Sequence, residues 1–200
     1  MKELLLTILR NKNTKIFEFR EAANKLANIL AQDTFKYLEE KPVKIKTPCG
    51  IATGKIEKNE IVLIPIWRAG IAFLNPFLYY FPKAKIGFFG IKRDEKTALP
   101  EKYYDNIPKI NSQNKIIILD PMLATGGTIV KAIKILRKKK VNQSQIIFVS
   151  LIAAPEGMKF LKKNFPKIKI VIGFTDKHLN KNKFIVPGLG DFGDRYFGTL

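Results

Sequence analysis

Continuous apolar runs recur along the chain with enough residues between them for a helix, and this spacing constrains the fold most. The runs are residues 61–65, 85–90, 115–119, 146–151 and 168–173. Apolar runs of this length are typical of strands buried on both faces of a parallel sheet. The segments between them favour helices, so the sequence predicts βαβ units: an α/β fold with a mostly parallel sheet flanked by helices.

The remaining segments complete this prediction. We expect helices over residues 17–40, 71–80, 128–139 and 156–164, and short edge strands around a turn at 48–50. The polar, proline-containing segment 92–108 predicts a protruding arm or hairpin. No repeat, linker or low-complexity tract divides the sequence, so residues 1–200 are predicted to form a single domain.

The scarcity of cysteine, histidine and long apolar stretches excludes several classes of protein. Cys49 and His178 are the single cysteine and the single histidine, which excludes an internal disulfide framework and a Cys/His metal site. The longest apolar stretch, 146–154, is about half of the ~20 residues that a membrane span needs. Residues 1–10 lack the pattern of a signal peptide, so we expect no membrane partner and a cytoplasmic location.

The formal net charge of +19 favours anionic ligands but predicts no specific nucleic-acid partner. Thirty of the 36 basic residues are lysines, and drift toward A/T-rich codons explains such an excess. Arginine offers a planar fork that matches phosphate, so the few arginines are more informative than the lysines. Arg68, Arg93 and Arg195 lie in glycine-rich or mixed polar segments and not on apparent helix faces, so they are the arginines to consider first for a functional role. The alternative is that the arginines are scattered by chance.

The most informative motif follows the apolar run 115–119. Asp120 stands at the expected carboxyl end of a strand, where ligands of open α/β sheets bind. Thr125, Gly126, Gly127 and Thr128 then form a turn before a predicted helix. Glycine amides and a helix N-terminus together make a phosphate cradle, and a carboxylate beside them can accept hydrogen bonds from sugar hydroxyls. The alternative is an ordinary strand-to-helix turn capped by a threonine.

A second glycine-rich segment lies near the C-terminus. Residues 188–193 satisfy G-x-G-x-x-G, but only seven residues follow Gly193, so no βαβ unit can complete a dinucleotide site. Main-chain amides and carbonyls of such a loop can instead meet the polar edge of a flat ligand. The alternative is a packed C-terminal tail.

Together these segments resemble the uracil phosphoribosyltransferase family. Asp120-Pro-Met-Leu-Ala-Thr-Gly-Gly-Thr128 resembles the family's motif for 5-phospho-α-D-ribose 1-diphosphate (PRPP). Supporting segments occur in the family's order: Pro65-Ile-Trp-Arg-Ala-Gly-Ile71, Gly90-Ile-Lys-Arg-Asp-Glu-Lys-Thr97, Ala153-Ala-Pro-Glu-Gly157 and the stretch from Ile185 to Thr199. The resemblance runs from about Leu4 to the C-terminus. It differs at Trp67, where the family usually has leucine, and at Phe184, where tyrosine is common.

The resemblance implies a role for each matching residue. Asp120 and Arg68 are the implied catalytic residues, and Arg68 and Arg93 are implied to hold the diphosphate of PRPP. The implied contacts to the ribose and its 5-phosphate come from Asp120, Pro121, Met122, Leu123, Ala124, Thr125, Gly126, Gly127 and Thr128. Uracil is implied to meet Ile185, Gly190, Asp191 and Phe192, with Asp191 also near PRPP. The cofactor is Mg²⁺, bound mainly through PRPP rather than by direct protein ligands.

The resemblance also implies a phosphoribosyltransferase-type fold and a reaction. Uracil and PRPP would give UMP and diphosphate in pyrimidine salvage, catalysed by a homodimer or a higher homo-oligomer, with GTP as a candidate effector. Three alternatives stay open: a regulator of this fold that senses UMP and binds RNA, a transferase for another base, and a catalytically inactive interaction protein. The intact Asp120, Arg68 and Arg93 argue against inactivity, and the C-terminal loop argues against a purine.

Overall fold

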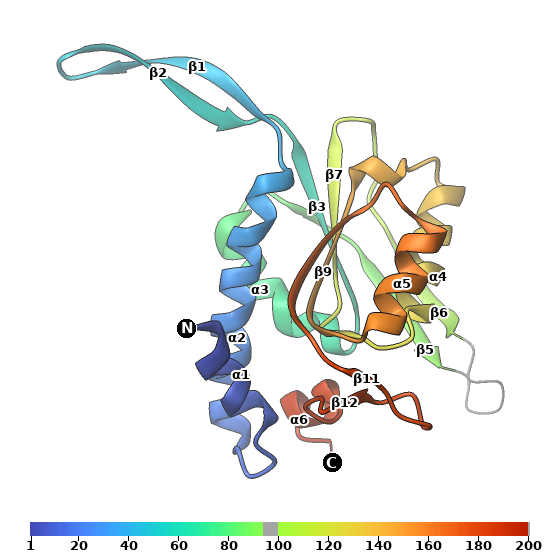
Figure 1. Ribbon diagram of the computed structural model, residues 1–200. Helices are drawn as coiled ribbons and strands as arrows, with labels where there is room; N and C mark the ends of the chain where they lie inside the picture. Colours follow the sequence, from blue (N-terminus) through green and yellow to red (C-terminus); the bar gives the residue numbers. More distant parts are fainter. Residues whose placement is uncertain (94–99, 200) are drawn as a thin grey trace.

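A mostly parallel sheet forms the centre of the computed structural model, which describes residues 1–93 and 100–199 (Figure 1). The side chains of residues 92, 93 and 100 lie outside this description. Across the sheet the strands follow in the order β10 (Lys169–Thr175), β9 (Ile146–Ala153), β7 (Asn114–Leu119), β3 (Glu60–Trp67), β5 (Phe88–Arg93) and β6 (Pro100–Asn106). The short strands β4 (Lys85–Ile86) and β8 (Met122–Leu123) pair with β3 and β9. Among the described strands of this sheet only β6 is antiparallel to its neighbour, so the predicted α/β class is confirmed.

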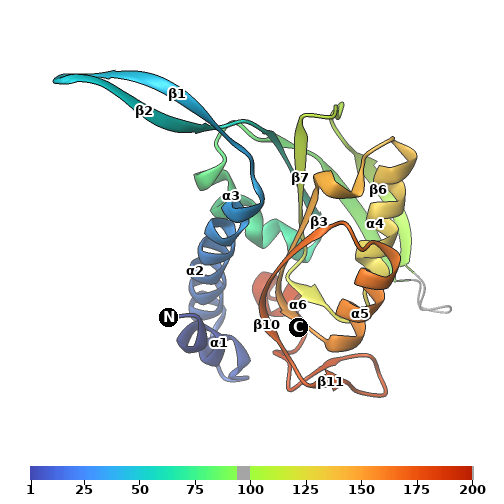
Figure 2. The same cartoon turned by 45° about the horizontal axis from the view of Figure 1, so that its top comes forward.

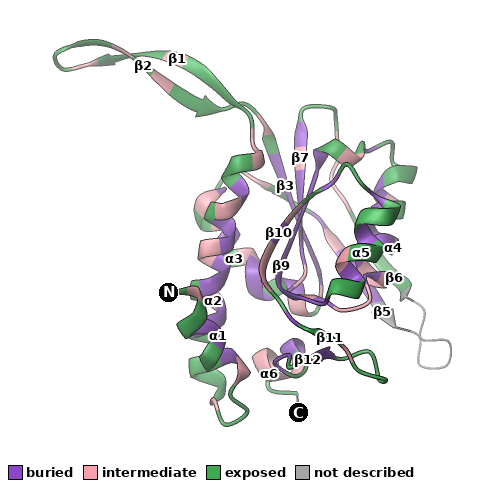
Figure 3. Ribbon diagram, in the orientation of Figure 1, coloured by how far each residue is buried: buried purple, intermediate pink, exposed green. Residues whose placement is uncertain are grey.

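Helices cover both faces of the sheet and bury its alternating side chains. One face carries α1 (Lys2–Arg10), α2 (Ile16–Thr34), the 3₁₀ helix η2 (Ala69–Phe73) and α3 (Leu74–Tyr80); the other carries α4 (Gly127–Lys138) and α5 (Pro155–Asn164). Leu63 and Ile117 pack toward the first group, whereas Ile64 and Ile118 pack toward the second. Figure 3 shows the result, with buried strands in the middle and exposed residues on the outer helix surfaces. The sheet thus has an apolar layer on each side.

A hairpin of β1 (Glu40–Thr47) and β2 (Gly50–Glu57) projects from this body (Figures 1 and 2). It forms a two-stranded sheet of its own, and its tip residue Ile51 is 81% exposed. The two short strands predicted around residues 48–50 are β1 and β2, which project from the body and do not join the main sheet as edge strands. The segment 92–108, predicted to form an arm or hairpin, forms part of an antiparallel hairpin, because β6 pairs with β5. In the described part of that segment, β6 lies along the sheet edge, where the ring of Tyr104 stacks on Trp67 with centroids 5.0 Å apart. Residues 94–99 lie outside the described residues.

The N-terminal helices differ from the prediction in extent. In α2 the buried residues Phe19, Leu26 and Leu30 recur at helical spacing, as expected. The helix ends at Thr34 and passes through the 3₁₀ turn η1 (Phe35–Tyr37), because Glu40 already begins β1. Helix α1 was not predicted, although Leu5, Leu6 and Leu9 bury one of its faces against the core.

The C-terminal segment crosses below the sheet in Figure 1 and brings the chain end back to α2. Its elements are β11 (His178–Leu179), β12 (Ile185–Val186) and α6 (Phe192–Phe197), whereas the 3₁₀ turn η3 (Gln143–Gln145) lies earlier in the chain, directly before β9. Helix α6 contacts both α2 and η2. Of the helices in the described ranges, none combines the length and the apolar character that crossing a membrane requires.

Candidate active site

The candidate site lies at the edge where the parallel strands β3, β7 and β9 end. The turn to η2 follows β3, the glycine-rich loop follows β7, and α5 follows β9. Because parallel strands share their direction, these connections lie at the same edge of the sheet. Helix α6 contacts η2 and so brings the C-terminal loop to this edge as well.

The glycine-rich loop has the geometry of an anion cradle. Gly126 adopts a left-handed conformation (φ 81°) directly before α4, and the first turn of α4 holds no acidic side chain. The loop also packs tightly on α5, since a Cβ atom on Gly157 would lie 2.2 Å from the carbonyl oxygen of Ala124. A hollow of about 60 Å³ remains over the loop, and its lining residues are Asp120, Met122, Leu123, Ala124, Thr125, Gly126, Thr128 and Ile129. The positive end of α4 is therefore open to an anion.

Asp120 lies half-buried at the mouth of this hollow. Burial raises its pKa to about 7, and the nearby carboxylate of Asp191 adds to the rise. The hydrogen bond that its Oδ1 accepts from the amide of Met122 acts in the opposite direction and is long, at 3.4 Å. Asp120 therefore keeps acceptor capacity for a ligand. The loop after β7 and the C-terminal helix both pack on η2: a Cβ atom on Gly70 would lie 2.3 Å from the carbonyl oxygen of Leu119, and one on Gly193 would lie 3.8 Å from Cβ of Ala69.

Arg68 follows β3 and points to the C-terminal helix. Its guanidinium pairs with Asp194 (Nη2 to Oδ1 3.0 Å), while the side chain stays 59% exposed. The preceding Trp67 turns toward the sheet edge, stacks on Tyr104 and packs against Phe88. The larger side chain in place of leucine is thus accommodated between β3, β5 and β6, away from the arginine.

The C-terminal loop presents its main chain rather than its large side chains. Ile185 is buried in the core, and the ring of Phe192 is fully buried against Phe19 at a centroid distance of 5.4 Å. Asp191 is exposed and caps α6 by accepting a hydrogen bond from the amide of Asp194 at 2.9 Å. Any contact of Phe192 with a base would have to come from its backbone.

Arg195, which stood out with Arg68 and Arg93 as an arginine in a glycine-rich segment, has a structural role. Its guanidinium donates hydrogen bonds to three carbonyl oxygens, those of Leu9, Leu189 and Asn11, and lies 4.4 Å from the ring centroid of Phe19. Arg195 therefore holds the C-terminal loop against the N-terminal helices. The side chain of Arg93, at the end of β5, lies outside the described residues.

Sequence reasoning missed two supporting pairs. Arg10 binds the buried carboxylate of Asp176 and the carbonyl of Gly188 (3.0 Å), and so fixes the start of the C-terminal loop. Asp194 binds Arg68, as described above. Both pairs join segments more than 120 residues apart in the chain, and the sequence carries no local signal for such contacts.

Comparison with known proteins decides the family. The family model described as uracil phosphoribosyltransferase matches residues 1–199. The chain belongs to the uracil phosphoribosyltransferase family. It is therefore a phosphoribosyltransferase, an enzyme of the glycosyltransferase class.

Individual relatives agree with this family. The chain is 41% identical over 195 residues to uracil phosphoribosyltransferase of Campylobacter concisus, covering 98% of this chain and 93% of the relative. It is 44% identical over 194 residues to the Malacoplasma penetrans enzyme of the same name, covering 97% and 93%. The solved structure of the AQ2163 protein from Aquifex aeolicus is similar with a TM-score of 0.89 at 35% identity, covering 98% and 93%.

A more distant structure supports the fold alone. A hypoxanthine phosphoribosyltransferase from Staphylococcus aureus matches with a TM-score of 0.50 at 16% identity, covering 78% of this chain and 74% of that one. The predicted phosphoribosyltransferase-type fold is thus confirmed.

The residues that the family resemblance implied for the site lie together in the structure. Arg68, the loop from Asp120 to Thr128 and the loop from Gly190 to Phe192 occupy one edge of the sheet. The individual roles of these residues, and that of Ile185, stay predictions. Across residues 1–93 and 100–199, no three His, Cys, Asp or Glu side chains gather as a metal site.

Proposed function

We propose that this enzyme transfers the phosphoribosyl group of PRPP to uracil, giving UMP and diphosphate. The observation that carries the proposal is the meeting of three segments at one edge: the anion cradle at α4 with Asp120, Arg68 after β3, and the C-terminal segment whose Asp194 pairs with Arg68. The names of the relatives, at 41–44% identity over nearly the whole chain, supply the base.

Each segment has a task in this reaction. The amides at the start of α4, with the hydroxyls of Thr125 and Thr128, bind the 5-phosphate. Asp120 accepts hydrogen bonds from the ribose hydroxyls, and Arg68 binds the diphosphate. The main chain from Gly190 to Phe192 meets the two carbonyl oxygens and the N3–H of uracil.

The chemistry breaks the bond between C1 of ribose and the diphosphate oxygen and forms the bond from C1 to N1 of uracil. The diphosphate leaves with the electron pair of the broken bond, and uracil gives up its N1 proton. Arg68 stabilises charge on the departing diphosphate, while the loops at both ends of the substrate hold C1 and N1 in reach of each other. Catalysis in this scheme is positioning and charge stabilisation by this chain's own groups.

Magnesium is proposed to accompany PRPP. The half-buried carboxylate of Asp120 lines the hollow over the glycine-rich loop, and oxygen donors of this kind suit Mg²⁺. Most of the remaining donors would be oxygens of PRPP. When bound, the ion neutralises charge on the diphosphate.

A homo-oligomer is a further part of the proposal. The projecting hairpin exposes Ile45 and Ile56 on one face, as the strand register shows, and an exposed apolar face of this kind suits contact with a second copy. Light scattering after size exclusion measures the assembly directly; a monomer at micromolar concentration would contradict it. GTP as an effector, a place in pyrimidine salvage and a cytoplasmic location rest on the family and the sequence, and stay predictions.

A base panel tests the proposed function. Purified protein is assayed with PRPP and Mg²⁺ against uracil, cytosine and hypoxanthine. Cytosine exchanges the O4 acceptor and the N3–H donor of uracil for a donor and an acceptor, which leaves main-chain groups unpaired. We expect kcat/KM for uracil to exceed that for the other bases by about a hundredfold or more. Comparable values for cytosine or hypoxanthine would overturn the assignment of the base.

A further inference from the structure

The side chain of Arg68 is held by a small network on α6. Oδ1 of Asp194 accepts hydrogen bonds from Nη2 of Arg68 at 3.0 Å and from the hydroxyl of Thr199 at 2.7 Å. The same hydroxyl lies 3.4 Å from Nη1 of Arg68 and accepts a hydrogen bond from it. Two residues of the C-terminal segment thus engage both terminal nitrogens of one arginine.

This network rests on a fixed support. The amide of Asp194 is bound by the capping carboxylate of Asp191 at 2.9 Å, and the buried ring of Phe192 anchors the helix in the core. At the other end of α6, the amides of Gly198 and Thr199 both donate to the carbonyl oxygen of Asp194, at 2.8 and 3.1 Å. Thr199 is therefore folded back onto Asp194, and the orientation of both side chains is set by the helix.

We propose that Asp194 and Thr199 are positioning residues that hold Arg68 in the orientation that meets the diphosphate of PRPP. This inference rests on the proposed function, which gives Arg68 that ligand. A guanidinium carries more N–H groups than these two contacts use, so others remain free for phosphate oxygens. Arg68 is 59% exposed, and without the network its long side chain would lose rotamer freedom each time PRPP binds.

The charge of Asp194 fits orientation better than competition with the ligand. The hydroxyl of Thr199 and then Arg68 lower the pKa of Asp194, so its carboxylate stays ionised and the contact persists at neutral pH. A protein with a net charge of +19 has positive potential in excess. The charge that Asp194 offsets is one unit of that excess, whereas bidentate binding of a phosphate depends on the direction of the arginine fork.

A binding experiment without turnover separates this role from a general one. Calorimetry measures Kd for PRPP with Mg²⁺, and Kd for UMP, in the wild type and in Asp194→Asn. UMP carries the 5-phosphate, ribose and base but no diphosphate. We expect Kd for PRPP to rise about tenfold, because an Arg68 that is no longer held loses its rotamer freedom when PRPP binds, and Kd for UMP to stay within twofold. Thr199→Val should raise Kd for PRPP by a smaller factor.

A double-mutant cycle shows whether Asp194 acts through Arg68. In an Arg68→Ala background, Asp194→Asn should raise Kd for PRPP no further. Tighter PRPP binding in the single Asp194→Asn variant would overturn the inference, because the contact would then compete with the ligand. An equal loss of UMP binding, or an undiminished loss in the Arg68→Ala background, would also overturn it. A wild type that shows this pattern yet transfers nothing to uracil would refute the proposed function and support the positioning role.

Discussion

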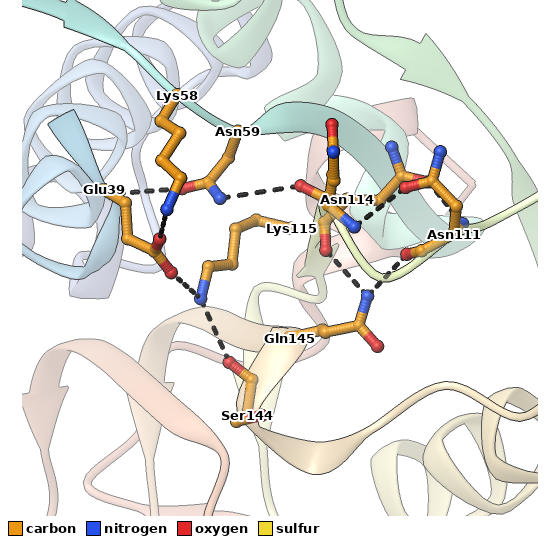
Figure 4. Close-up of polar contacts among 9 residues, drawn as sticks. Glu39, Lys58, Asn59, Asn111, Asn114, Lys115, Ser144 and Gln145 are labelled. Atoms are coloured by element: carbon orange, nitrogen blue, oxygen red, sulfur yellow. Dashed lines mark hydrogen bonds and ion pairs between the residues drawn. The ribbon is translucent and has the colours of Figure 1, made fainter. Parts of the chain in front are cut away.

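The polar side chains at the two edges of the central sheet differ in how fully they are hydrogen-bonded. At the amino edge, where β3 and β7 begin, the polar side chains bind one another (Figure 4). Glu39 pairs with Lys58 at 3.0 Å and with Lys115 at 3.3 Å, and hydrogen bonds from these two lysines lower its pKa. The amide nitrogen of Gln145 donates to the carbonyls of Asn111 and Asn114, at 2.7 and 2.9 Å.

At the carboxyl edge the polar side chains have hydrogen-bonding groups that a ligand can use. Asp120 has one long side-chain hydrogen bond and a pKa raised to about 7, and Arg68 is more than half exposed. Buried polar groups without full partners cost stability, so an arrangement of this kind is expected where a ligand completes the bonding. The amino edge of the sheet thus contributes to stability, and the carboxyl edge provides the ligand site.

The largest effect is expected from Asp120→Asn. Asparagine keeps the shape but loses the charge that accepts two ribose hydroxyl bonds, each worth roughly 1.5–3 kcal/mol. We expect kcat/KM for PRPP to fall by about a hundred- to a thousandfold. Steady-state kinetics measure the loss, and a thermal melt of the same sample shows that the variant is folded. A change within twofold would remove Asp120 from the site.

At the opposite edge, Asn114→Ala should affect stability instead. The fully buried side chain of Asn114 accepts a hydrogen bond from the amide of Asn111 at 2.7 Å and donates one to Glu60 at 3.0 Å. Removing it breaks both hydrogen bonds, one of them to the charged Glu60, so we expect a loss of about 2–3 kcal/mol in the free energy of unfolding. Urea denaturation measures it, with the exposed Gln113→Ala as the control. A normal stability with reduced kcat/KM would reverse the roles of the two edges.

Arg68→Lys should reduce activity with little effect on stability. A rigid fork becomes a point charge, and the loss of one charged hydrogen bond predicts a ten- to hundredfold fall in kcat/KM for PRPP, roughly. Lys138→Ala, at the end of α4, is the control and should change neither property. If Arg68→Lys stays within twofold while Lys138→Ala lowers kcat/KM, the phosphate role is misplaced. If Arg68→Lys unfolds the protein, Arg68 is structural.

The smallest predicted effect is a pH dependence of stability. Unfolded Asp120 loses its proton near pH 4, roughly, whereas in the fold it does so at about 7. Between these values the folded state holds more protons, so this group lowers the free energy of unfolding as pH rises toward 7. Asp120→Asn should remove that decline. As pH rises from 5 to 8, its free energy of unfolding should therefore increase relative to that of wild type by on the order of 2 kcal/mol. Urea titrations at both pH values that shift in parallel for the two proteins would contradict it.

The sequence predicted the elements whose formation depends on residues close together in the chain. The strands β3, β7 and β9 were identified because continuous apolar runs have few alternatives, and the loop from Asp120 to Thr128 because strand, glycines and helix are adjacent in sequence. The strands β1 and β2 were predicted around the turn at 48–50, but their projection from the body was not, because they bury almost nothing and their periodicity does not say where they lie.

The support of the site was beyond sequence reasoning for a different reason. The pairs Arg68–Asp194 and Arg10–Asp176 depend on tertiary packing of distant segments. Rarity of arginine identified Arg68 and Arg195 equally, yet Arg195 binds main-chain carbonyls. Composition cannot separate an arginine that holds a loop from one that awaits a ligand.

The separation of the two edges is tested most directly by measuring UMP formation and thermal unfolding on the same preparations of wild type, Asp120→Asn and Asn114→Ala. The account predicts that wild type forms UMP from uracil and PRPP, that Asp120→Asn unfolds at or above the wild-type temperature and loses nearly all activity, and that Asn114→Ala unfolds at a lower temperature with normal kcat/KM below it. An active Asp120→Asn, or an Asn114→Ala that is stable and inactive, would contradict it.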